Sequence, residues 1–224
     1  MKRRYTMGLA GAAAAAALLG ACTASGPATP QKKMSFFVTS VNPGKGGDFG
    51  GLAGADRYCQ SLAESVGAGG RTWRAYLSSS ATPGSAAVNA RDRIGRGPWV
   101  NAKGEVVAAS IDELHGTNNN LTKQTALTEK GDVNSGRGDP VNQHDILTGS
   151  SPDGRAVSDG KDNTCGNWTR SGEGSAIVGH HDRSGLDDGA AAKSWNSSHA
   201  TQGCSVEAFR KTGGAGLLYC FAEN

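Results

Sequence analysis

The sequence has no hydrophobic run long enough to cross a membrane. Its apolar run, Met7–Leu19, covers 13 residues, whereas a bilayer core about 30 Å thick needs roughly 20. The run follows a basic start of Lys2, Arg3 and Arg4. This is the pattern of a secretory signal peptide, which is removed from the mature protein, and not that of a transmembrane helix.

Several motifs of enzymes and metal sites are also missing. The chain has no His-Glu-x-x-His segment and no serine in a nucleophile elbow. No two cysteines stand two to four residues apart, as the usual zinc-binding spacing requires. Net charge is lacking too, because the chain has 23 basic and 20 acidic residues and three basic ones leave with the signal peptide. A neutral domain gives no reason to expect a nucleic-acid partner.

The end of the apolar run predicts where in the cell the protein is located. Leu19-Gly20-Ala21-Cys22 resembles the lipobox of bacterial lipoproteins, in which the cysteine is lipidated and becomes the new N-terminus. We therefore predict a signal peptide over residues 1–21 and a membrane anchor at Cys22. Thr23 follows the cysteine where inner-membrane lipoproteins have an aspartate, so the resemblance favours the outer membrane of the cell envelope.

Small residues and prolines over residues 22–33 are typical of a flexible tether. The remaining segment, 34–224, is long enough for one domain with a substantial core, and no repeat indicates a second. Four cysteines lie in it: Cys59, Cys165, Cys204 and Cys220. An even number in an oxidising compartment indicates two disulfides, for which three pairings exist.

Periodicity predicts a few regular elements. Apolar residues recur at helical spacing over Gly51–Val66, and a glycine-rich stretch ends this helix. Short strands are expected at Thr72–Leu77 and, joined by a hairpin turn, at Trp99–Asn101 and Glu105–Ala108. Ser110 and Glu113 have capping-box spacing and should open a short helix that ends at Gly116.

The second half of the chain is less regular. Few apolar residues occur over Thr117–Arg155, which we expect to form long irregular loops. The apolar tail Gly216–Ala222 predicts a buried strand. One early helix, short strands, long loops and a buried final strand together predict an α+β domain.

Several segments resemble endostatin, a collagen-derived domain with a C-type lectin-like fold. They are LAGADRYCQSLAESVGAGG, RTWRAYLSSS, RDRI with PWVNAKGEVV, DILTGSSPDGR, TCGNWTR and GCSVEAFRKTGGAGLLYCFAEN. The resemblance spans Ala53–Asn224, is interrupted over Thr117–Asn142, and extends to exported bacterial proteins described as lectin-like. It implies an endostatin-like domain with nested disulfides, Cys59–Cys220 and Cys165–Cys204.

The resemblance also bears on ligands. Endostatin binds heparin through surface arginines, and this chain has a basic stretch that could hold acidic polysaccharide: Arg71, Arg74, Arg91, Arg93 and Arg96. Endostatin's zinc ligands lie near its N-terminus, and Met34–Phe49 contains no histidine, so that site is not carried over. The calcium motif of C-type lectins is missing as well, since Trp195-Asn196-Ser197 lacks the lectins' final carboxylate.

A polar segment inside the inner disulfide supplies the candidate binding or loop-fixing residues. They are His180, His181, Asp182, Arg183, Trp195, Asn196 and His199. The two adjacent histidines point in opposite directions on an extended backbone, which disfavours a shared metal. We therefore expect Asp182 and one histidine to fix the loop, with no cofactor; bound calcium or zinc is the less favoured alternative.

The sequence favours a membrane-anchored, non-catalytic, lectin-like binding module for a glycan or an extracellular protein. Two alternatives stay open. One is a hydrolase or other metal-dependent enzyme that uses His180, His181, Asp182 and His199. The other is an envelope protein with a structural role alone.

Overall fold

The computed structural model describes residues 1–2 and 33–223. Contacts divide the chain into two units, Met1–Pro30 and Gln31–Asn224, and the helices and strands of the described residues lie in the second. The predicted lipidation at Cys22, and nearly all of the predicted signal peptide and tether, lie outside the described residues. None of the described helices is long and apolar enough to cross a membrane.

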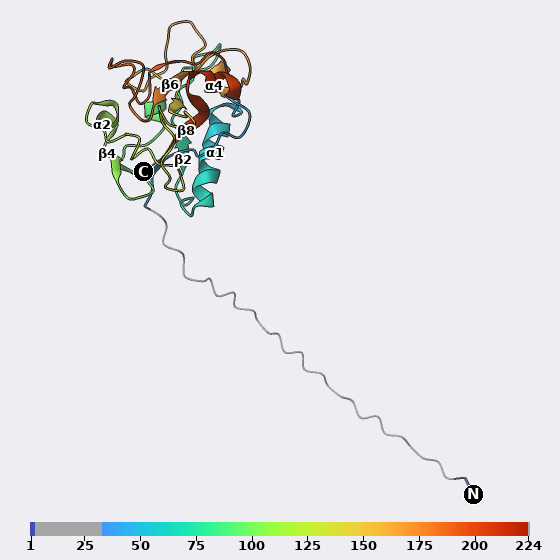
Figure 1. Cartoon of the computed structure of the whole chain (residues 1–224). Helices are drawn as coiled ribbons and strands as arrows, with labels where there is room; N and C mark the ends of the chain where they lie inside the picture. Colours follow the sequence, from blue (N-terminus) through green and yellow to red (C-terminus); the bar gives the residue numbers. More distant parts are fainter. Residues whose placement is uncertain (3–32, 224) are drawn as a thin grey trace. The chain divides into compact units, whose positions relative to one another are not determined.

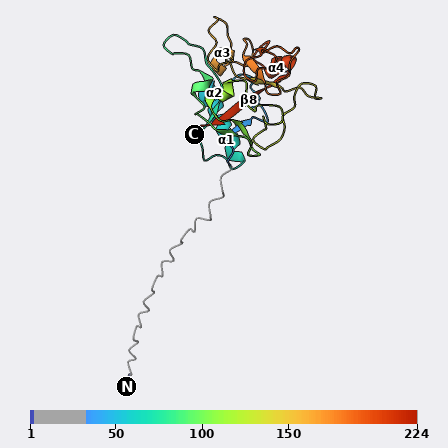
Figure 2. The same cartoon turned by 90° about the vertical axis from the view of Figure 1, so that its left-hand side faces the viewer.

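A mixed sheet of short strands forms the centre of the domain, and the final strand, β8, runs through its middle (Figures 1 and 2). Its strands are β1 (Phe36–Val38), β2 (Trp73–Ala75), β5 (Asp145–Leu147), β6 (Ile177–His180), β7 (His199–Ala200) and β8 (Gly214–Ala222). β8 pairs antiparallel with β1 and β2 and parallel with β5. The sheet then continues antiparallel through β6 to β7.

The other elements surround this sheet. They are α1 (Gly51–Ser65), the 3-10 turn η1 (Ala90–Asp92), the hairpin β3 (Trp99–Val100) and β4 (Val106–Ala108), α2 (Ile111–His115), α3 (Cys165–Trp168) and α4 (Val206–Thr212). In Figure 1, α1 lies to one side of β8, and β4 and α2 lie to the other. The domain is therefore α+β, as the sequence predicts.

β8 separates two hydrophobic clusters. Leu218, Cys220 and Ala222 face the cluster that contains α1, whereas Leu217 and Tyr219 alternate with them and face the cluster of the β3–β4 hairpin. Successive side chains of a strand point to opposite faces. A strand buried on both faces needs an uninterrupted apolar sequence, and this explains the composition of the tail.

Most predicted elements are present with small shifts. The first helix ends one residue before the predicted end, and β8 begins two residues earlier than the apolar tail. Ser110 caps α2 by accepting a hydrogen bond from the Glu113 N–H at 3.2 Å. The Glu113 carboxylate accepts from the N–H of Ala109 at 2.9 Å, one residue before the position that a regular capping box uses.

Two expectations were wrong in part. The sequence predicts only the helix over Gly51–Val66 and the short one opened by Ser110, whereas the described residues also form α3 and α4. The segment Thr117–Arg155, expected to be irregular, contains β5. This strand has only three residues, all buried, and its partners β6 and β8 come from distant parts of the chain. Its stability depends on those partners, so local composition could not reveal it.

Both disulfides have the nested pairing that the resemblance implies. Cys59–Cys220 joins α1 to β8 across 161 residues, and Cys165–Cys204 closes a loop of 39 residues. The second bridge begins in an unusual turn, α3, whose four residues all have positive φ. Left-handed backbone costs roughly 1–2 kcal/mol per non-glycine residue. Hydrogen bonds hold it there, including those from Gly166 N–H to Asp162 and from the Trp168 indole to Ser78 O.

Candidate functional site

Strand register brings a histidine and an aspartate together from separate segments. Asp145, the first residue of β5, is the cross-strand partner of His180, the last residue of β6. His199 begins β7 opposite Val178, two residues before His180 on the same strand. Cross-strand partners and residues two apart share one face of a sheet. His144, just before β5, adds a ring that stacks on His180 with centroids 4.1 Å apart.

Three imidazoles converge on one carboxylate oxygen. The Nε2 atoms of His144, His180 and His199 lie 3.2, 3.3 and 3.4 Å from Oδ1 of Asp145. The Asp145 side chain is 1% exposed, and those of His144 and His180 are 3% and 5% exposed. His199 is the accessible member, with 37% of its side chain exposed. We call these four residues the histidine–aspartate cluster.

In each imidazole, Nδ1 is the nitrogen that does not face Asp145, and it has a hydrogen-bond acceptor. Nδ1 of His180 donates to Ala192 O at 2.7 Å, and Nδ1 of His199 faces Ala200 O at 3.2 Å. In His144, Nδ1 lies 3.2 Å from the carboxylate of Asp182. Carbonyl and carboxylate oxygens only accept, so Nδ1 carries the proton in each ring. A neutral ring then presents a lone pair at Nε2.

Polar atoms in the interior of the cluster lack well-aligned hydrogen-bond partners within the described part of the chain. Among the described residues, no well-aligned hydrogen bond reaches Oδ1 or Oδ2 of Asp145 or Nε2 of His180, although all three atoms are buried. Burial opposes ionisation of Asp145, but His180 and His199 outweigh it and lower the pKa of the carboxyl. In return, the Asp145 carboxylate raises the pKa of His199, against the effect of burial.

Asp182 supports the cluster from outside. It accepts the N–H groups of Arg137 at 2.6 Å and Ser184 at 3.0 Å, in addition to Nδ1 of His144. Burial opposes its ionisation, but the hydrogen bonds from His144 and these two N–H groups lower the pKa of Asp182 well below the usual range. The predicted loop-fixing role of Asp182 therefore agrees with its contacts, and the histidine it contacts is His144.

Replacing Asp182 by alanine should lower the free energy of unfolding by about 1–3 kcal/mol, because two backbone donors and one imidazole lose their acceptor. Chemical denaturation of the variant measures this loss. Asp188→Ala is the matched control, since its side chain is 96% exposed and its ion pair with Lys193 lies in solvent. Equal stability of the two variants would contradict the role of Asp182.

The other predicted residues separate into different environments. The ring of His181 points away from the cluster and contacts Ser135 O, and burial lowers its pKa. Arg183 donates to Leu121 O and Lys193 O, and Trp195 donates to Leu114 O. Asn196 is buried and donates to the hydroxyl of Tyr76 at 3.0 Å. Arg183, Trp195 and Asn196 line a second cavity of about 440 Å³. Of the predicted set, only His180 and His199 belong to the cluster.

His144 and Asp145 are functional candidates that the sequence interpretation missed. They stand in Gln143-His144-Asp145-Ile146-Leu147, where a polar pair precedes two apolar residues. Such a junction between a loop and a buried strand was a usable signal. It was hidden because the surrounding segment contains few apolar residues.

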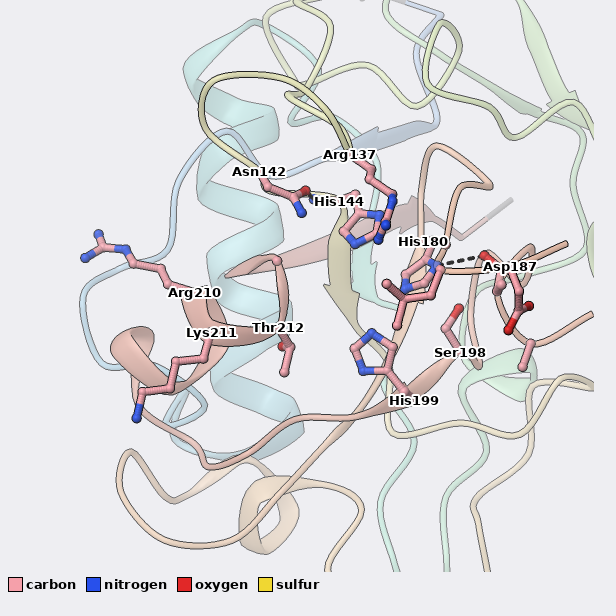
Figure 3. Close-up of a pocket in the computed structure, with 15 residues that line it drawn as sticks. Arg137, Asn142, His144, His180, Asp187, Ser198, His199, Arg210, Lys211 and Thr212 are labelled. Atoms are coloured by element: carbon pink, nitrogen blue, oxygen red, sulfur yellow. Dashed lines mark hydrogen bonds between the residues drawn. The ribbon is translucent and has the colours of Figure 1, made fainter. Parts of the chain in front are cut away.

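A cavity of about 660 Å³ opens beside the cluster (Figure 3). The rings of His144, His180 and His199 lie together in its wall, and Arg137 extends toward His144. Arg210 and Lys211 of α4 also line it, with their tips directed away from the histidines in this view. Asp187 is the exposed acid of the lining. The cavity is thus predominantly cationic, and a volume in this range suits a small ligand.

The chain matches none of the models of known protein families, and no curated protein matches it. No family is therefore assigned to this chain.

The basic stretch proposed for polyanions is largely engaged by acids. Arg93 and Arg74 both bind the Asp56 carboxylate, with nitrogen–oxygen distances of 2.7 and 3.1 Å. Arg91 lies 3.6 Å from Asp112 and donates to Asp153 O. Arg71 is half-buried and Arg96 is exposed. Polyanion binding by this stretch remains a prediction.

Proposed function

We propose that the protein is a lipid-anchored binding module of the bacterial cell envelope, and that it holds an acidic glycan in the cationic cavity without altering it chemically. The resemblance to endostatin and C-type lectin-like domains supports a binding role, and the lipobox-like segment ending at Cys22 supports the anchor, with the outer membrane as the favoured location. The nested disulfides fit the same domain type. An extracellular protein with an acidic surface is the other ligand class that this chemistry admits.

One observation carries the proposal. Arg137, Arg210 and Lys211 line the same cavity, and within the described part of the chain their side chains form no ion pair at 4.0 Å or less. Unpaired cations around a concave surface attract sulfate or carboxylate groups through charge-assisted hydrogen bonds. Exposed contacts of this kind weaken as salt rises.

The full chain should be retained on immobilised heparin at low salt and released as salt is raised. The triple variant Arg137→Ala/Arg210→Ala/Lys211→Ala should bind at least about tenfold more weakly, equivalent to about 1.4 kcal/mol. Arg71→Ala/Arg96→Ala, which removes two positive charges, is the comparison from the basic stretch. Retention lost in the comparison variant and kept in the triple variant would assign polyanion binding to the basic stretch and contradict the cavity.

A metal-dependent hydrolase is the second candidate, and the histidine–aspartate cluster in the wall of the same cavity is the observation that favours it. Product analysis separates the two functions. A binding module returns the bound oligosaccharide at its original length, whereas a hydrolase shortens it. A structural envelope protein would show neither retention nor cleavage.

A further inference from the structure

We propose that His144, Asp145, His180 and His199 form a binding site for one divalent transition-metal ion of the zinc class. This inference goes beyond glycan binding, because the ion needs no glycan in the cavity.

Geometry is the first argument. Two ligand atoms on a tetrahedral zinc ion with bonds of about 2.0–2.2 Å lie roughly 3.3–3.6 Å apart. The three distances from Asp145 Oδ1 to the imidazole Nε2 atoms, 3.2–3.4 Å, are close to this separation. The ligand atoms of His144, Asp145 and His180 also lie within 4.8 Å of one another. His199 lies outside this three-residue group, although its Nε2 atom is 3.4 Å from Asp145 Oδ1. The proposed fourth ligand position therefore requires its partly exposed ring to move toward His144 and His180.

The proton positions are the second argument. Each Nδ1 has an oxygen acceptor, so each neutral imidazole directs a lone pair from Nε2 toward a carboxylate oxygen that also carries lone pairs. Lone pairs that face one another repel unless a cation lies between them. Shared protons or a metal ion can supply that cation, and the buried oxygens of Asp145 lack a well-aligned hydrogen bond from any described residue. A metal ion would satisfy all of these atoms at once.

Charge balance is the third argument. Asp145 supplies one negative charge directly, and Asp182 supplies a second through its contact with Nδ1 of His144. Two carboxylates balance a divalent cation in a site this deeply buried. The Asp182–His144 contact also has the form of the carboxylate–histidine–metal arrangement, which fixes the tautomer and orientation of a ligand ring.

Ligand chemistry selects the kind of ion. Three imidazole nitrogens and one carboxylate suit zinc and similar transition metals. Calcium takes six to eight oxygen ligands, which this cluster does not offer. Zinc should therefore bind at micromolar concentration in the presence of millimolar calcium.

The test is a titration of the full chain, stripped of metal by a chelator, with Zn²⁺ alone. We expect one equivalent of Zn²⁺ per chain. Asp182→Ala removes a supporting carboxylate and should lower the Zn²⁺ affinity roughly 10–100-fold. His180→Ala and His144→Ala each remove a ligand and should lower the Zn²⁺ affinity by more than that. His181→Ala and His115→Ala are the controls, since one removes an adjacent buried histidine and the other a distant one.

Folding of each variant is checked by near-ultraviolet circular dichroism, and Co²⁺ in place of Zn²⁺ reports the ligand geometry through its visible spectrum. A tetrahedral Co²⁺ spectrum that His180→Ala abolishes in a folded protein supports the site. Absence of binding, several weakly held ions, or an affinity unchanged in His180→Ala would each overturn it. No glycan is present, so failure of this test leaves the heparin result for the cationic cavity unaffected.

Discussion

Replacing Cys59 and Cys220 by alanine should lower the free energy of unfolding by about 5 kcal/mol. The bridge spans 161 residues, and the entropy that such a cross-link removes from the unfolded chain has this magnitude. Both cysteines are fully buried, so alanine avoids placing an unpaired hydroxyl group in the core. Urea denaturation of the double variant measures the loss.

The inner bridge is the comparison. Its loop of 39 residues predicts a smaller entropic loss, about 4 kcal/mol, for Cys165→Ala/Cys204→Ala. Since total stability of a domain is about 5–15 kcal/mol, either double variant should be close to unfolding at 37 °C. A loss of stability below about 1 kcal/mol in both variants would show that the two bridges do not restrict the conformational entropy of the unfolded chain.

Asp56→Ala is the point substitution with the largest expected effect on stability, about 3–5 kcal/mol. Asp56 lies in α1 and is 7% exposed. Both oxygens of its carboxylate accept hydrogen bonds from Nη2 of Arg93, at 2.7 and 2.8 Å. It also accepts the N–H of Ala75 in β2 at 3.0 Å. Removing it leaves a guanidinium of low exposure without its counter-charge and a strand N–H without its acceptor.

Thermal and urea denaturation of Asp56→Ala measure this loss. Glu64→Ala is the control, because Glu64 is an exposed acid of the same helix, and surface substitutions usually change stability by no more than about 0.5 kcal/mol. The double variant Asp56→Ala/Arg93→Met should recover part of the lost stability, because it also removes the positive charge that no longer has a carboxylate partner. Equal destabilisation by Asp56→Ala and Glu64→Ala would contradict the interpretation.

Local pattern was enough to predict the elements that depend on their own sequence. Helix α1 has apolar residues at helical spacing, α2 begins at a serine cap, and β8 is an apolar run buried on both faces. Each of these signals is contained within one segment. The predicted disulfides came from the resemblance, since cysteine count alone left three pairings.

The histidine–aspartate cluster could not be predicted in the same way. Asp145 meets His180 because of the register between β5 and β6, and His199 joins through the register between β6 and β7. These strands have only two to four residues, which is too short for a periodic pattern to indicate the pairing. The sequence therefore indicates His180 and His199 only as polar residues of a loop, and it gives no indication that His144 and Asp145 lie beside them.

The position of β8 in the chain determines when the domain can form. Ribosomes synthesise β1, α1 and β2 long before β8, yet Phe36 of β1 pairs with Phe221 and Trp73 of β2 pairs with Ala222. Until residues 214–222 have emerged, these early strands have no central partner, and Cys59 of α1 lacks its native disulfide partner, Cys220. Contacts between such distant residues also slow folding. The domain must therefore assemble after nearly all of its residues have been made, and its early apolar segments need protection until then.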